Sequence, residues 1–282
     1  MDTIPCILFH IGNHPYVHLC LKQALYFNND VHILTDIPSQ FNYDGLTTVS
    51  FQNYSLRMNQ FQPMYKHFST NSYQLEFICI VRWMCIYEYM QQKGIKKAFI
   101  FDSDILLYSN ISEIIKTHLH EDMYLCTSVS KNVTGSASVF TLDKLEKFVQ
   151  FTFQFYKTQI PNIIKWKKNY TENGGICDMT LLYYFAHEET EFVGLRLPNL
   201  PYFKNDLTTI FNDDFTFDLN VGVTGNQLYP NDYEMKDSRK IITMDNKQSF
   251  CYNNRLNKRI RFVTLHFQGP HKKVMDKYFV NN

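Results

Sequence analysis

Short apolar runs alternate with helical patterns along the first fifty residues. Residues 4–11 and 31–36 are apolar runs of strand length, and residues 15–28 between them carry apolar side chains at helical spacing. A further run at 46–51 can add a third strand. A strand–helix–strand unit this compact predicts parallel pairing with a crossover connection.

Residues 72–93 form the longest helical pattern, and one arginine interrupts its apolar stripe. The stripe contains Leu75, Ile78 and Tyr89, but Arg82 lies among them. A buried arginine needs an anionic partner. We therefore expect Arg82 to meet carboxylates or a ligand, the alternative being that its side chain extends to the surface.

The second half of the chain changes from helical patterns to alternating ones. We expect helices over 142–158 and 173–187, and a turn over 131–135. The expected strands are 122–129, 136–141, 211–219, 241–244, 250–252 and 261–267. A turn at 245–247 would join two of them. This order predicts an α/β protein with a mixed, mostly parallel central sheet flanked by helices and with C-terminal β-hairpins.

Composition removes some classes of protein from consideration. The chain has 282 residues, 45% of them hydrophobic, and a net charge of +1, which argues against a nucleic-acid-binding protein. Its seven cysteines are scattered, without a Cys-x-x-Cys pair, which favours reduced thiols. No basic N-terminal region precedes an apolar stretch, and no run reaches the ~20 residues of a membrane span. We expect a cytoplasmic protein without a transmembrane segment.

The most informative motif is a pair of carboxylates at the end of an apolar run. Ala98–Phe101 read as a buried strand, and Asp102-Ser103-Asp104 follow directly. Two carboxylates at such a position cost several kcal/mol unless a positive charge compensates them. Mg²⁺ or Mn²⁺ is a suitable partner because both prefer oxygen ligands and keep positions open for phosphates. The alternative is an ordinary turn or helix N-cap.

A second motif near the C-terminus supplies matching chemistry. A β run ends in His266, Gly269 follows three residues later, and Lys272 three after that. An imidazole can be a third metal ligand, a glycine lets the backbone approach a phosphate, and a lysine adds positive charge. The alternative is a strand-to-tail turn with solvated lysines.

Together these residues resemble the retaining family-8 glycosyltransferases of the GT-A fold, a Rossmann-like nucleotide-diphospho-sugar transferase architecture. The resemblance spans about residues 4–275 and rests on Arg82, Asp102-Ser103-Asp104 and the late His-x-x-Gly-x-x-Lys. A small-residue segment, 134–138, matches the family loosely. The family's Asp-Gln at a helix start corresponds here to Asp178-Met179, so the amide is missing.

The resemblance implies roles for individual residues. Asp102, Asp104 and His266 would hold Mn²⁺ or Mg²⁺, with Asp104 ligating directly and Asp102 spanning metal and ribose. Asp178 would contact the donor sugar or the acceptor hydroxyl, and otherwise it is a carboxylate favoured at a helix N-terminus. The donor and its phosphates would be bound by His10, Gly12, Asp36, Arg82, Ser103, Gly269 and Lys272.

The implied reaction moves a sugar from a nucleotide diphosphate to a hydroxyl group. The donor would be a UDP-sugar, or else a GDP-sugar, and the acceptor a glycan, a protein or a lipid-linked molecule. With retention, the acceptor attacks on the leaving-group face or a carboxylate intervenes, and the sequence leaves both open. The chain would form one domain, 1–282, in which 1–110 bind the nucleotide and 111–282 serve the acceptor and the late metal loop.

Three other functions compete. A haloacid-dehalogenase-like phosphatase also places Asp-x-Asp after a strand, and 212–214 could be its distal acidic pair, but that motif normally opens the domain and is followed by Thr or Val where this chain has Leu106. A nucleotidyltransferase would need a glycine-rich basic loop after the first strand, which His10–Asn13 do not supply. The third is a catalytically silent nucleotide-sugar-binding module.

Overall fold

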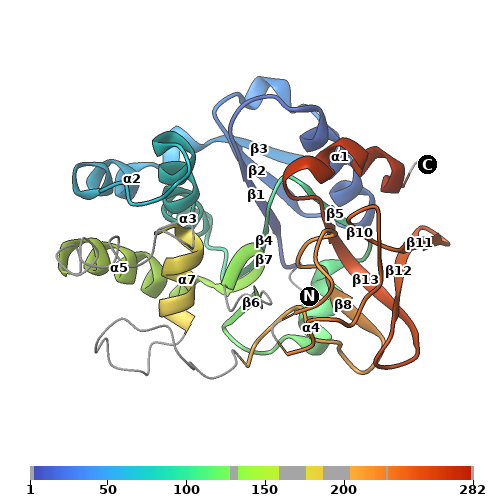
Figure 1. Ribbon diagram of the computed structural model, residues 1–282. Helices are drawn as coiled ribbons and strands as arrows, with labels where there is room; N and C mark the ends of the chain where they lie inside the picture. Colours follow the sequence, from blue (N-terminus) through green and yellow to red (C-terminus); the bar gives the residue numbers. More distant parts are fainter. Residues whose placement is uncertain (1–2, 128–132, 159–175, 187–203, 227, 281–282) are drawn as a thin grey trace.

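The computed structural model describes residues 3–127, 133–158, 176–186, 204–226 and 228–280 (Figure 1). Its central sheet has six strands in the order β3-β2-β1-β4-β7-β6. The strands are β1 (Cys6–His10), β2 (Val31–Thr35), β3 (Leu46–Ser50), β4 (Lys97–Phe101), β6 (Met123–Thr127) and β7 (Val133–Thr141). β3, β2, β1 and β4 pair in parallel, and β7 is antiparallel to both of its neighbours. The predicted mixed, mostly parallel sheet is confirmed.

Helices cover both faces of this sheet. The α-helices are α1 (Pro15–Phe27), α2 (Leu56–Phe61), α3 (Tyr73–Lys93), α4 (Ile111–His118), α5 (Leu142–Thr158) and α7 (Asp178–Ala186). Alternate residues of β1 enter two separate cores: Cys6 and Leu8 pack with α1, and Ile7 and Phe9 pack with α3, α5 and α7. Figure 1 shows the latter three helices together on one side of the sheet. The parallel strands therefore run between two layers of helices, and their carboxyl ends lie together at one edge of the sheet.

A second sheet joins β5 to C-terminal strands, in the order β11-β12-β13-β5 and with β8 pairing to β13. Its strands are β5 (Ile105–Leu107), β8 (Phe215–Phe217), β11 (Ile242–Asp245), β12 (Gln248–Asn253) and β13 (Lys258–His266). β9 (Met235–Lys236) and β10 (Arg239–Lys240) form a separate two-stranded ribbon. Because β5 follows β4 after only three residues, Asp102–Asp104 connect the two sheets.

Local sequence explains where the long helix begins and ends. The Ser72 hydroxyl accepts a hydrogen bond from the Leu75 N–H at 3.3 Å, which is an N-cap for α3. Gly94 ends the helix with a φ of 68°, a left-handed conformation that suits glycine. The predicted turn between β11 and β12 is also confirmed, since Asn246 and Lys247 both have positive φ.

Some elements differ from the sequence expectations. The predicted turn at 131–135 is wrong at its end, because β7 begins at Val133 and continues through small residues that pair with β4. The helix expected from 173 begins at Asp178, and 173–175 lie outside the described residues. The short helix α2 and the ribbon β9–β10 were not predicted, because elements of two to six residues carry no clear periodicity.

Helices of 3₁₀ type complete the description, at Pro38–Gln40, Phe51–Tyr54, Gln62–Met64 and Gly269–Tyr278, the last labelled η5. Within the described part of the chain, none of the helices has the length and apolar character needed to span a membrane. The division of the chain at residue 110 and the cytoplasmic location stay predictions.

Candidate functional site

The two acidic residues of the motif lie in the turn between β4 and β5. The Asp102 N–H donates to the Ser136 carbonyl of β7 at 2.8 Å, and the Ile105 N–H donates to the Asp102 carbonyl at 3.2 Å. The Asp104 carbonyl accepts from the Phe267 N–H at 2.9 Å, just beyond the end of β13. The turn is thus held by the central sheet on one side and by the second sheet on the other.

The pairing of β13 with β5 brings His266 next to Asp104. His266 is opposite Ile105 in the antiparallel register, and its Nε2 lies 3.4 Å from Asp104 Oδ1. Its Nδ1 lies 2.6 Å from the Leu219 carbonyl, to which it donates. A donating Nδ1 leaves Nε2 of the neutral ring with a free lone pair, and that nitrogen faces the carboxylates.

Asp102, Asp104 and His266 form one compact group of possible metal ligands. One ligand atom from each lies within 4.8 Å of the others. Burial disfavours the charged His266, but the neighbouring carboxylates outweigh it and raise the pKa of His266 to about 9. Burial opposes ionisation of Asp104, but His266 and Lys272 outweigh it and hold the pKa of Asp104 well below its usual range. The predicted meeting of these three residues is confirmed.

Lys272 approaches the same carboxylate from η5. Its Nζ lies 3.1 Å from Asp104 Oδ2 and 4.9 Å from the centre of the Tyr16 ring. Gly269 begins η5 with a φ of 63°, a backbone conformation that an L-residue rarely adopts. The late motif therefore returns toward the acidic turn, as the sequence predicted.

Arg82 connects the acidic turn with Asp178. One guanidinium nitrogen of Arg82 donates to Asp102 Oδ1, and the other donates to Asp178 Oδ2 at 3.0 Å. The Trp83 indole N–H donates to the same Asp178 oxygen at 3.4 Å. The expectation that Arg82 meets carboxylates is confirmed, and the surface alternative is excluded by its 15% exposed side chain.

The ends of β1 and β2 also meet near this turn. The Gly12 N–H donates to Asp36 Oδ1 at 2.9 Å, so two of the residues expected to bind the donor lie together. His10 is buried, its Nε2 has no hydrogen-bond partner, and burial with the charge of His14 lowers its pKa to about 4. The His10 imidazole is therefore neutral at physiological pH and offers an unused polar atom beside the site.

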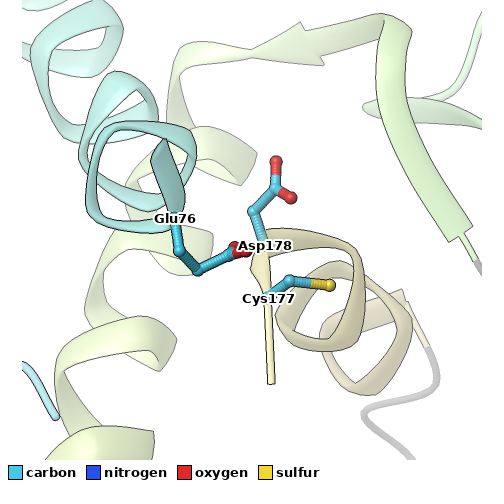
Figure 2. Close-up of side chains that lie close together, drawn as sticks. All are labelled: Glu76, Cys177 and Asp178. Atoms are coloured by element: carbon cyan, nitrogen blue, oxygen red, sulfur yellow. The ribbon is translucent and has the colours of Figure 1, made fainter. Parts of the chain in front are cut away.

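A second group of possible metal ligands consists of Glu76, Cys177 and Asp178. Figure 2 shows Glu76 reaching from α3 toward the first turn of α7, where Cys177 and Asp178 lie. Burial raises the pKa of the Glu76 carboxyl. Burial also raises the pKa of the Cys177 thiol to about 11, so the thiol is protonated at neutral pH and this group is a weaker candidate for a cation than the Asp102 group.

The phosphatase hypothesis requires a second acidic pair in residues 212–214, and these residues lie in a turn before β8. Asn212 and Asp213 have positive φ in this turn, and Asp214 lies 3.7 Å from Arg261 with its side chain 70% exposed. Asp102 is paired with Arg82 rather than free to attack a phosphorus atom. Both observations weigh against a haloacid-dehalogenase-type mechanism.

Sequence reasoning missed several residues at the site. Tyr16 lies under Lys272 and interacts with Ser103, and no pattern around it predicts that contact. Trp83 adjoins Arg82 in sequence, which is a signal that could have suggested a shared partner. Asp218 directly follows the buried strand β8, as Asp102 directly follows β4, and it accepts the His266 N–H at 3.1 Å.

The solved structures that resemble this chain include two glycosyltransferases, both with weak similarity. No protein-family model matches the chain, and no curated protein does. Mouse xyloside xylosyltransferase 1, apo form, shares 11% identity over 66% of this chain and 82% of its own, with a TM-score of 0.41. The apo glycosyltransferase GlyE of Streptococcus pneumoniae TIGR4 shares 14% identity over 64% of this chain and 42% of its own, with a TM-score of 0.34. At these scores we draw no inference from either.

Proposed function

We propose that this protein is a metal-dependent glycosyltransferase that moves a sugar from a nucleotide diphosphate, most simply UDP, to a hydroxyl acceptor with retention of configuration. The observation that carries the proposal is the convergence of Asp102, Asp104 and His266, whose ligand atoms lie within 4.8 Å of one another. Two oxygen donors and one imidazole suit Mn²⁺ or Mg²⁺.

The surroundings of this group support the fit. Among the residues that the structure describes, six buried side-chain polar atoms have no hydrogen-bond partner, and three of them belong to residues around this group: His10 Nε2, Arg82 Nε and Ser136 Oγ. Buried polar atoms are normally paired, and a ligand bound at this group would supply partners for these three. When bound, a divalent cation would neutralise the charge that grows on a departing diphosphate.

The protein's own residues perform the remaining tasks. The Lys272 ammonium lies beside the Asp104 carboxylate, and it would bind a diphosphate oxygen in addition to Asp104. The η5 backbone after Gly269 would approach the same phosphates. His10, Gly12 and Asp36, at the ends of β1 and β2, would surround the ribose and base, with Ser103 between them and the metal.

Asp178 is the residue best placed for the sugar side of the reaction. It begins α7, it is buried, and Arg82 and Trp83 both donate to one oxygen of its carboxylate. That arrangement fixes the carboxylate at a defined distance from Asp102. We propose that its other oxygen binds the donor sugar or the acceptor hydroxyl. Asp104 would bind the metal ion directly, so that the positive charge of the ion lies close to the departing diphosphate.

Donor hydrolysis tests this function without knowledge of the acceptor. The purified protein should release nucleotide from one member of a panel of UDP- and GDP-sugars only when Mn²⁺ or Mg²⁺ is present. Asp104→Asn should lower that rate at least ~10²–10³-fold, the size typical of lost transition-state charge stabilisation. Asp44→Asn, an exposed residue in the loop before β3, is the matched control and should retain the rate.

Two results would contradict the proposal. One is the absence of nucleotide release from every donor with either metal. The other is release at the wild-type rate by Asp104→Asn. Hydrolysis of a generic aryl phosphate at a comparable rate would instead favour the phosphatase.

A further inference from the structure

A buried ion pair lies against the backbone of His266. Lys240 of β10 and Asp218 are almost fully buried, and Lys240 Nζ lies 2.7 Å from Asp218 Oδ1. Removing two charges from water costs free energy that their attraction often fails to recover. A pair in this position therefore calls for an explanation other than stability.

Asp218 is hydrogen-bonded to the backbone of His266, and Lys240 is hydrogen-bonded to the backbone of the segment that contacts the imidazole. The second carboxylate oxygen of Asp218 accepts the His266 N–H at 3.1 Å. The Asp218 N–H donates to the Thr264 hydroxyl at 3.0 Å, two residues before the histidine on β13. Asp218 thus holds the end of β13 in place through Thr264 and His266.

Lys240 fixes the segment that orients the imidazole. Its Nζ also donates to the Asn220 carbonyl at 2.6 Å, and its own N–H donates to the Val221 carbonyl at 2.7 Å. The Leu219 carbonyl lies inside this clamped segment and accepts the Nδ1–H of His266. The Val221 N–H donates back to the His266 carbonyl at 2.9 Å, which closes the connection.

We propose that Lys240 and Asp218 are positioning residues, which hold the His266 imidazole with Nδ1 on the Leu219 carbonyl and Nε2 toward Asp104. The inference rests on the proposed function, because it concerns the affinity of that site for its cation. A fixed ring loses no rotational freedom when it binds a metal, and its Nδ1–H···O=C bond selects the required tautomer. Outer partners of this kind typically change metal affinity by about 10–100-fold.

The test compares Mn²⁺ affinity, measured from the electron paramagnetic resonance signal of free Mn²⁺, between matched variants. Lys240→Met alone leaves Asp218 buried without a partner and can fail to fold. Asp218→Asn/Lys240→Met removes both charges together and keeps an amide oxygen for the His266 N–H. The control is Asp232→Asn/Arg255→Met, which removes the Arg255–Asp232 pair near β12, with its 3.1 Å contact.

We expect the Asp218/Lys240 double variant to weaken Mn²⁺ binding about tenfold or more. The control should stay near the wild-type dissociation constant even where the two variants lose similar thermal stability. In a His266→Ala background, the same double substitution should no longer change Mn²⁺ affinity, because its effect passes through the imidazole.

The outcomes separate the two proposals. Wild-type protein that binds no Mn²⁺ would overturn both the proposed function and this inference. Wild-type binding with an unchanged constant in the Asp218/Lys240 variant would overturn the inference alone. An equal loss in the control, or the same loss with His266 removed, would reduce the pair to a structural role and also overturn it.

Discussion

At the residue scale, the Asp104 carboxylate lies at the centre of the charged side chains of the site. It faces the His266 imidazole at 3.4 Å and the Lys272 ammonium at 3.1 Å while it is almost fully buried. Without a cation these two groups compensate the carboxylate. A metal ion that binds between Asp104 and His266 must displace the proton from the imidazole. The metal and the proton therefore compete for one site.

This competition predicts how metal affinity depends on pH. The pKa of His266 is raised from 6.5 to about 9, so the metal-free ring carries a proton at neutral pH. Mn²⁺ affinity should rise with pH between 6.5 and 9 by up to about tenfold per unit and then level off. Calorimetry in two buffers of different ionisation enthalpy should detect close to one proton released per ion. Affinity independent of pH over this range would contradict the assignment of His266.

The stability of the metal-free protein should show the opposite trend. A histidine whose folded-state pKa is raised stabilises the fold fully below its unfolded pKa, and that contribution is lost as pH rises through the folded value. For His266 the window lies between 6.5 and about 9. Thermal unfolding in excess chelator should therefore occur at a lower temperature at the upper end of that window. The His266→Ala protein should lack this part of the pH dependence.

The sequence indicated the residues of the candidate site more clearly than the residues that hold them in position. Asp102 and His266 each end an apolar run and Asp104 directly precedes one, and a polar residue at the end of a buried strand is visible in the sequence. Arg82 is visible because it breaks an apolar stripe. Lys240 carries no such signal, since it lies in a two-residue strand and meets Asp218 only through the packing of β10 against the 218–221 segment. Contacts of that kind depend on tertiary structure.

At the element scale, the position of α3 against β7 determines how Arg82 and Trp83 reach Asp178. Gly135 of β7 makes this approach possible. A Cβ at that position would lie 2.3 Å from Trp83 Cζ2 and 2.4 Å from Cη2, so a residue larger than glycine requires the indole to shift. The small-residue segment 134–138, which the sequence matched only loosely to an acceptor-side region, has a packing role in this structure.

Gly135→Ala should therefore reduce both stability and activity. We expect a loss of about 1–3 kcal/mol in the free energy of unfolding, because the added methyl forces the buried indole to move. The movement should also lower the donor hydrolysis rate, since the indole N–H is bonded to Asp178. Chemical denaturation and the hydrolysis assay measure the two effects.

The control for this substitution is the Trp83→Phe background. The phenyl ring lacks the far edge of the indole, which is the part that a Cβ at 135 would meet. The added cost of Gly135→Ala should be smaller there. An equal cost in both backgrounds would show that the destabilisation does not arise from contact with Trp83.

At the scale of the whole molecule, the candidate metal ligands come from both sheets. Asp102 and Asp104 lie where the central sheet passes into β5, and His266 ends β13 of the second sheet. Figure 1 shows β4, β5 and β13 meeting in the middle of the molecule. The sequence predicted the longer helices and strands and the mixed sheet. It did not predict that β5 crosses into the second sheet, because the pairing of β5 with β13 joins residues more than 150 positions apart.

A cation bound between the two sheets should stabilise them together. At about 100 times its dissociation constant, Mn²⁺ should add about 2.7 kcal/mol to the free energy of unfolding. Hydrogen exchange should slow together at the amides of 101–107 and of 262–268. The Asp104→Asn protein should show neither effect. Protection confined to one of the two segments would contradict a shared ligand set.

The most direct measurement is anomalous diffraction at the manganese edge from crystals grown with Mn²⁺ and UDP. The account predicts one strong peak within coordination distance, about 2.0–2.4 Å, of both the Asp104 carboxylate and His266 Nε2, with the diphosphate on its open side near Lys272. A bound nucleotide with no manganese between these two side chains would contradict it.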